Sequence, residues 1–314
     1  MRAQSPNETV VYTGISGVAA STSTTVSQAA IGGVLGDRGK LSEEAAQRGG
    51  PLVANNKEFM LLPMGKEGGH FSTMMQELLA ADYPDITSET LPFVHEAIEK
   101  LKGAEAESEL NVGTFGVDDR DHDYLYNFYE KWDRSYALQH AYLDYIDKIV
   151  KPLYGGEAIL VQKTPNLRFN IPGSSAIGGK SDDPDGCIGL HCDSDPPQFH
   201  SCAETNYIVA LTDMSGSSSL YVEKSSATVH LPFNEEYCEN AVCPRSHCIA
   251  FAGSLLRHYN KENTTGKTRI SLDFRCMPLA AYDPKSKYQL GKYYMIMGDQ
   301  QSKLWPPPPP HQRF

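Results

Sequence analysis

Residues 258–275, HYNKENTTGKTRISLDFR, contain a polar turn followed by a strand in which side-chain type alternates strictly. Successive side chains of a strand point to opposite faces. One face therefore carries Ile270, Leu272 and Phe274, and the other carries Arg269, Ser271, Asp273 and Arg275. Burying a guanidinium costs free energy unless it is paired with an acceptor. We therefore interpret Arg269 and the Ser271 hydroxyl as a binding site for a carboxylate, held by charge-assisted hydrogen bonds.

Short strand-like runs with turns between them extend upstream from this stretch to residue 157. They include AILVQK at 158–163, NLRFNI at 166–171, TNYIVALTD at 205–213 and HCIAFAG at 247–253. Eight or more such runs, separated by Gly, Pro, Asn and Asp turns, favour a sandwich or a jelly-roll barrel. The predicted fold class is mainly β with helical additions, in which a β core packs against N-terminal helices.

Helical patterns occupy the chain before these strands. Residues 71–84 and 90–103 carry helix start and stop signals. The strongest helix is predicted over about 121–150, where four aromatic residues are spaced four apart: Tyr124, Phe128, Trp132 and Tyr136. We interpret this stripe as core packing, with an aromatic ligand site as the alternative.

The predicted organisation is a single domain in four parts. They are a loose arm at 1–35, a helical part at 36–156, the β core at 157–277, and a C-terminal extension at 278–314 that holds a proline run at 306–310. The proline run is predicted to be a solvated polyproline II tail. The loop at 173–186 is predicted to be either a mobile lid or a plain surface connection.

Composition excludes several classes of protein. A formal net charge of −11 over 314 residues disfavours a nucleic-acid-binding surface. Seven cysteines, an odd number without zinc-knuckle spacing, are interpreted as reduced thiols. No run approaches the roughly 18 apolar residues of a membrane helix, and the N-terminus lacks a secretory apolar run. The sequence therefore predicts a cytoplasmic protein with no membrane partner, and it leaves the oligomeric state open.

Residues 187–200, CIGLHCDSDPPQFH, concentrate potential metal ligands. On an extended segment the side chains of His191 and Asp193 converge, while Cys192 points away. Two histidines and one carboxylate on a face are typical of non-haem Fe(II) sites. The third ligand is sought downstream among three histidines: His230, His247 and His258. His258 is favoured because SLLRHYN is predicted to return as a second strand beside the sheet that carries His191.

Other polar residues are candidates for binding a cosubstrate or a substrate. Arg168 and Asn170 share one face of their strand, and a structural network inside the barrel is the alternative for both. Asn206 is predicted to point into the barrel as a cosubstrate or substrate contact.

Two more candidates concern the substrate. Arg275 lies on the same face of its strand as Arg269 and is predicted to bind an anionic group of the substrate. The alternative is an ion pair with Asp273 or another acid. His200 lies past the DPPQF turn, so it is placed at the pocket mouth and not on the metal.

The order of these motifs resembles a known family. H-x-D at 191–193, a distal histidine at 258 and Arg-x-Ser at 269–271 are similar to the Fe(II)/2-oxoglutarate-dependent dioxygenases, whose core is a double-stranded β-helix, a jelly-roll or cupin-like fold. The resemblance covers about residues 157–277. ETNYIVALTD, SSSLYVE and NTTGKTRISLDFR are similar to the phytanoyl-CoA dioxygenase-like and antibiotic-biosynthesis oxygenase branch.

The resemblance implies the ligands and the chemistry. His191, Asp193 and His258 would bind Fe(II), and Arg269 with Ser271 would bind the distal carboxylate of 2-oxoglutarate. O2 is the second cosubstrate, and ascorbate is expected to help in vitro. The reaction implied is oxidation of an unactivated C–H bond, with release of succinate and CO2.

The resemblance also suggests a class of substrate. We expect a small, anionic, amino-acid-like metabolite of secondary metabolism, oxidised by hydroxylation or by oxidative ring closure. The algal kainoid synthases, which cyclise an N-prenylated glutamate, are similar to this branch. The alternative is a non-catalytic cupin-like protein that binds a metal or a small molecule, and the complete Arg-x-Ser pair favours the enzyme.

Overall fold

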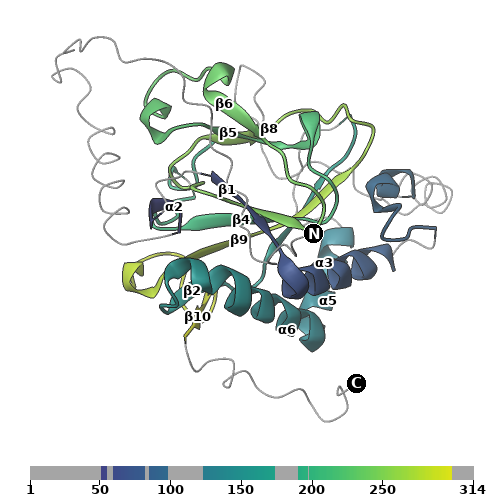
Figure 1. The fold of residues 1–314 in the computed structure, drawn as a ribbon, viewed down its shortest axis with the longest axis horizontal. Helices are drawn as coiled ribbons and strands as arrows, with labels where there is room; N and C mark the ends of the chain where they lie inside the picture. Colours follow the sequence, from purple (N-terminus) through teal and green to yellow (C-terminus); the bar gives the residue numbers. More distant parts are fainter. Residues whose placement is uncertain are drawn as a thin grey trace, which may run out of the picture.

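The computed structural model describes residues 51–54, 59–81, 85–97, 123–173, 190–196 and 198–298. The predicted arm at 1–35, nearly all of the predicted loop at 173–186, and the proline run at 306–310 lie outside these residues. A small sheet lies over a large one, and helices cover the opposite side of the large sheet (Figure 1).

The α-helices come before most of the strands in the chain. They are α2 (Pro51–Ala54), α3 (Gly65–Ala80), α5 (Asp123–Arg134) and α6 (Tyr136–Tyr145), and α6 continues into the π turn η2 (Ile146–Val150) and the 3-10 turn η3 (Lys151–Tyr154). The other 3-10 turns are η1 (Leu91–Phe93), η4 (Gly216–Ser218), η5 (Ser226–Thr228), η6 (Glu235–Tyr237) and η7 (Leu279–Ala281).

The single helix predicted over about 121–150 is wrong, because the chain leaves the helical conformation at Ser135, with φ −93° and ψ 91°. The Ser135 hydroxyl accepts a hydrogen bond from the Leu138 amide, so it caps the start of α6. Trp132, from the predicted aromatic stripe, is buried against Tyr142 with ring centroids 5.4 Å apart. The side chains of Tyr124 and Phe128 lie outside the described part.

Every pairing between named strands is antiparallel, which confirms the mainly β class with helical additions. The large sheet has the order β1-β7-β4-β9-β2-β10, with β3 also beside β9, and the small sheet has the order β6-β5-β8. The strands are β1 (Phe59–Pro63), β2 (Ile159–Gln162), β3 (Asn166–Asn170), β4 (Thr205–Ala210), β5 (Leu220–Glu223), β6 (Cys238–Ala241), β7 (His247–Phe251), β8 (His258–Asn260), β9 (Arg269–Pro278) and β10 (Tyr294–Met297).

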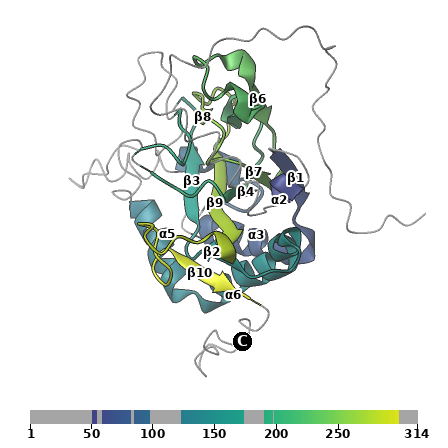
Figure 2. The ribbon, with the colours of Figure 1, turned by 90° about the vertical axis from the view of Figure 1, so that its left-hand side faces the viewer.

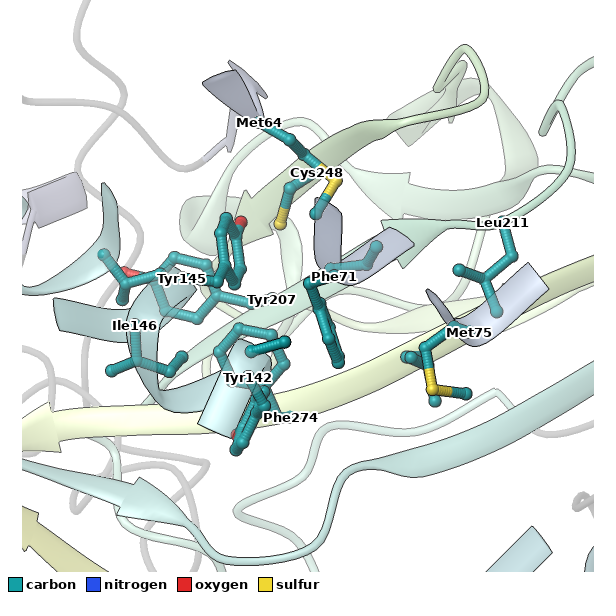
Figure 3. Packing of buried hydrophobic residues seen from close by; sticks show 14 of the residues in the cluster. Met64, Phe71, Met75, Tyr142, Tyr145, Ile146, Tyr207, Leu211, Cys248 and Phe274 are labelled. Atoms are coloured by element: carbon teal, nitrogen blue, oxygen red, sulfur yellow. The ribbon is translucent and has the colours of Figure 1, made fainter. Parts of the chain in front are cut away.

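The apolar face of β9 packs against the helices. Phe274 stacks on Tyr207 of β4 at 5.2 Å and meets Tyr142 of α6 edge-on at 5.3 Å. Phe71 of α3 contacts Tyr142 at 5.5 Å. These rings form the centre of the larger core (Figure 3). The alternating residues of β9 therefore give it an apolar face that packs against the helices and a charged face on the opposite side of the sheet.

A second apolar cluster joins the large sheet to the small one. Ile208 of β4 and Ile249 of β7 belong to it, together with Val222 of β5 and Leu256. The charged face of β9 lies on the same side of the large sheet as Ile208, because Ile208 is opposite Asp273 in the register. The polar side chains of β9 are therefore directed toward the region that the small sheet covers.

Strands from outside the predicted 157–277 core complete the large sheet. β1, which precedes the helices, pairs with β7, and β10, near the C-terminal end, pairs with β2. Figure 2 shows β9 between β3 and β4, with β2 and β10 at its far end. Within the described residues, no helix has the length and apolar character that a membrane crossing requires.

Candidate metal centre

The structure brings His191, Asp193 and His258 together. Their potential ligand atoms all lie within 4.8 Å of one another. His191 forms an isolated bridge with His258 at the start of β8, in which each backbone amide donates to the other residue's carbonyl, at 3.2 and 2.9 Å. Among the described residues, neither His230, which is exposed, nor His247, whose ring contacts the Arg245 carbonyl, belongs to this group.

The group is closed on one side and open on the other. The side chains of Asp193 and His258 are 1% and 8% exposed, whereas that of His191 is 37% exposed. His191 Nε2 lies 3.3 Å from Asp193 Oδ1, and His258 Nε2 lies 3.9 Å from the same oxygen. Cys192 between the two ligands is buried and does not join them. The three donors therefore converge on one point that is accessible from the His191 side.

His258 is held in the form that binds a metal. Its Nδ1 lies 3.0 Å from the Leu256 carbonyl, so the proton of the neutral ring is placed there and Nε2 presents a lone pair. Burial, together with the neighbouring His191, lowers the pKa of His258 to about 4. The imidazole is therefore neutral throughout the physiological range.

This low pKa predicts an acid-dependent loss of stability in the metal-free protein. The unfolded chain protonates His258 near pH 6.5, but the folded protein does so only near pH 4. The folded state therefore loses stability as the pH falls through this window, by about 2 kcal/mol between pH 7 and pH 5. Urea unfolding with a chelator present is expected to show this loss in the wild type and not in His258→Gln. His230→Gln, an exposed control, should behave as the wild type, and equal slopes for all three would contradict the assignment.

The two oxygens of Asp193 have different neighbours. Oδ1 faces the histidines, while Oδ2 accepts hydrogen bonds from Asn206 Nδ2 at 2.6 Å and from Arg275 Nε and Nη2 at 3.0 and 2.8 Å. Burial raises the pKa of Asp193, but Arg275 and the two histidines outweigh it and hold that pKa well below its usual value. Asp193 is therefore an anion, ready to bind a cation through Oδ1.

This geometry bears on two predicted ligand contacts. Asn206 and Arg275 were expected to bind a cosubstrate or a substrate, but both donate to Asp193. For Arg275 the structure favours the alternative of an ion pair with an acid. Its main partner is Asp193, at 2.8 Å, and Glu204 lies 3.7 Å from its Nε. Register explains the convergence, since Asn206 lies directly opposite Arg275 in the pairing of β4 with β9.

Arg269 is a buried cation that forms no ion pair with a carboxylate in the described part of the chain. It is 3% exposed, its Nε has no hydrogen-bond partner, and no carboxylate of a described residue forms an ion pair with it. Burial and the neighbouring Arg168 lower its pKa to about 10, so it remains a cation at neutral pH. Beside it in the register lies Asn170, whose side-chain oxygen and nitrogen are also buried and unbonded. Buried polar groups of this kind fit an anionic ligand.

The remaining candidates are engaged elsewhere. Arg168 donates to Asp273 Oδ1 at 3.1 Å and is 31% exposed, so it keeps some access to the region between the sheets. His200 is buried; its Nδ1 lies 2.9 Å from Glu204 Oε2 and its ring stacks on Tyr288 at 3.8 Å. The ring of His200 is therefore packed inside the protein, and its predicted place at a pocket mouth stays a prediction.

Sequence reasoning missed the contribution of the C-terminal extension. Arg275 Nη1 donates to the Tyr293 hydroxyl at 3.3 Å, and that hydroxyl donates to Gln162 Oε1 at 2.9 Å. The Tyr294 hydroxyl donates to Glu204 at 2.6 Å. The tyrosines of KYQLGKYY at 287–294 were the available signal, but nothing in that run indicates which strand it lies beside.

Comparisons with known proteins can be set against this geometry. The chain is similar to the streptomycin biosynthesis protein StrG of Streptomyces griseus. The identity is 27% over 180 residues, which span 52% of this chain and 77% of StrG. No protein-family model matches the chain.

Solved structures with a likeness to this one include enzymes of antibiotic biosynthesis. The non-heme alpha ketoglutarate dependent epimerase SnoN, from nogalamycin biosynthesis, aligns over 76% of this chain and 83% of its own, with 11% identity and a TM-score of 0.39. HygX from Streptomyces hygroscopicus, with nickel and 2-oxoglutarate bound, aligns over 71% and 82%, with 14% identity and a TM-score of 0.28. At such TM-scores these likenesses carry no argument about the activity of this chain.

Proposed function

We propose that this chain is an Fe(II)/2-oxoglutarate-dependent oxygenase of secondary metabolism with a double-stranded β-helix core. The observation that carries the proposal is Arg269, a buried cation without an acidic partner among the described residues. It lies on the same face of β9 as Arg275, which binds the carboxylate of the candidate metal group. A metal site and an anion site thus share one side of the large sheet, as a chelating cosubstrate with a distal carboxylate requires.

The residues of the site fit the metal and the cosubstrate. His191, Asp193 and His258 supply two imidazole nitrogens and one carboxylate oxygen, a donor set suited to Fe(II). Arg269, with Ser271 and Asn170 beside it, would hold the distal carboxylate of 2-oxoglutarate. Fe(II) and 2-oxoglutarate supply the oxidation by O2 of a substrate C–H bond, with conversion of the cosubstrate to succinate and CO2.

The substrate is proposed to be a small polar metabolite that approaches from the His191 side. Arg168 is the remaining candidate for contact with an anionic group, because it is a cation whose side chain is 31% exposed while it pairs with Asp273. Hydroxylation and oxidative ring closure, including closure of an N-prenylated glutamate, are the reaction outcomes to be distinguished. The similarity to a streptomycin biosynthesis protein adds intermediates of antibiotic biosynthesis to the candidates.

A non-catalytic cupin-like binding protein is the second candidate. It would account for the two histidines and the carboxylate, but it would not require a buried arginine that pairs with no carboxylate of the residues that the structure describes. Arg269 therefore favours the oxygenase.

Succinate formation tests the proposal. Protein loaded with Fe(II) is incubated with 2-oxoglutarate, O2 and ascorbate, alone and with panels of amino acids, N-alkylated acidic amino acids and amino sugars. We expect succinate above the metal-free background, raised by the correct substrate class. His191→Ala should abolish it, while Arg134→Gln, on an exposed arginine of α5, should not. Fe(II) binding without any succinate, in the presence of every panel, would favour the binding protein.

A further inference from the structure

The carboxylate of Asp193 is held asymmetrically. Three N–H groups donate to Oδ2, from Asn206 and from both Nε and Nη2 of Arg275. Oδ1 is left to face the two histidine Nε2 atoms at 3.3 and 3.9 Å. A carboxylate binds a metal through one oxygen or through both, and here the second oxygen has its lone pairs engaged by donors.

The donors themselves are fixed by their surroundings. Arg275 is 8% exposed and Asn206 is 4% exposed, and they sit opposite each other on β9 and β4. Gly253 completes the arrangement: a Cβ there would lie 2.7 Å from the Asn206 amide group, and its carbonyl accepts the Asp193 amide at 3.0 Å. Backbone and side chain of Asp193 are therefore located by the same small set of contacts.

We propose that Arg275 and Asn206 are positioning residues that restrict Asp193 to one-oxygen binding of the metal, which keeps a coordination position free for the cosubstrate. The inference rests on the proposed function, because it concerns the same metal. It also assigns a role to the C-terminal extension. The Tyr293 hydroxyl, just before β10, accepts a hydrogen bond from Arg275 Nη1 and donates one to Gln162 Oε1 of β2, so it helps to orient the guanidinium.

A purely structural ion pair would give a different pattern. Such a pair needs only that the two charges lie close together, and a fork facing both oxygens of Asp193 would satisfy it. Instead both arginine nitrogens and the Asn206 amide are directed at the one oxygen that faces away from the histidines. That arrangement leaves Oδ1 as the oxygen available to the metal.

Anaerobic titration with Co(II) tests the inference without turnover. Arg275→Lys keeps the charge but loses the two-point contact, Asn206→Ala removes the third donor, and Gly253→Ala displaces Asn206. Each is expected to weaken Co(II) binding by roughly 10- to 100-fold, as loss of outer-shell partners does. Each should also change the visible absorption of bound Co(II), since a second carboxylate oxygen would enter the coordination shell.

Matched controls separate positioning from general damage. Arg134→Lys and Asn240→Ala alter exposed residues and should leave affinity and spectrum unchanged. Tyr293→Phe removes one hydroxyl and is expected to shift the spectrum less than Arg275→Lys does. Variants that fold, by circular dichroism, yet keep wild-type Co(II) affinity and spectrum would overturn the inference.

The outcomes also distinguish this inference from the proposed function. If His191→Ala abolishes Co(II) binding while Arg275→Lys and Asn206→Ala change nothing, the metal site stands and the positioning role is wrong. If the wild type binds no Co(II), both fail. If Arg275→Lys does not fold, Asn206→Ala and Gly253→Ala still test the contacts to Asp193 Oδ2, and their Co(II) affinity and spectra decide whether the positioning role is correct.

Discussion

Replacing Arg269 with methionine is expected to weaken 2-oxoglutarate binding by roughly 30-fold to several thousand-fold, while the affinity for the metal stays unchanged. Removing one partner from a buried charge pair costs about 2–5 kcal/mol, and no other arginine of the described site is free of an acidic partner to replace it. Calorimetric titration of 2-oxoglutarate into the Co(II)-loaded protein, without O2, measures the effect. A variant with wild-type affinity would remove the main support for the oxygenase.

The same substitution should stabilise the ligand-free protein. Burial lowers the pKa of Arg269 to about 10, which means that folding disfavours its cationic form at every pH below that value. Replacing a buried charge that has no ion-pair partner among the described residues with an apolar side chain of similar length is expected to raise the free energy of unfolding by about 1–4 kcal/mol. Urea unfolding of Arg269→Met and of the exposed control Arg134→Met checks this. Weaker binding of 2-oxoglutarate together with a more stable ligand-free protein in Arg269→Met would identify Arg269 as a ligand-binding residue.

Asp193→Ala is expected to lose both metal binding and stability. It removes the one carboxylate ligand and leaves the Arg275 guanidinium buried without its main partner. Breaking a buried pair from one side costs about 3–5 kcal/mol. His191→Ala should abolish metal binding at little cost in stability, because the His191 side chain is 37% exposed. Metal titration and urea unfolding with a chelator present measure the two effects separately.

A double variant provides the control for that prediction. Asp193→Ala combined with Arg275→Met removes both charges, so it is expected to recover much of the lost stability and none of the metal binding. Equal stability of the single and double variants would show that the pair with Arg275 does not account for the loss.

Local periodicity was sufficient to predict part of the site. The alternation along 269–275 assigned Ile270, Leu272 and Phe274 to one apolar face, because strand parity is a property of consecutive residues. The structure packs that face against the helices. The pairing of His191 with His258 followed from a predicted chain reversal. These inferences needed no knowledge of which distant strands become neighbours.

The partners of Arg275 could not be predicted in the same way. Its carboxylate partner Asp193 lies 82 positions away in the chain, and Tyr293 contacts Arg275 from the turn before β10, beyond the predicted core. The alternation along the strand placed Arg275 on the charged face of β9. It could not predict which acidic residue the pairing of distant strands would bring beside Arg275. The break at Ser135 was missed for a related reason, since the aromatic spacing continues across a residue whose side chain forms an N-cap.

The two outer strands of the large sheet have a consequence for dissecting this protein. β1 and β10 come from either side of residues 157–277, and they cover β7 and β2. A fragment limited to 157–277 would expose the backbone of HCIAF and ILVQ as open sheet edges, and apolar edges of this kind recruit other chains. We expect such a fragment to aggregate. In the full chain, β1 and β10 prevent self-association by pairing with these two strands.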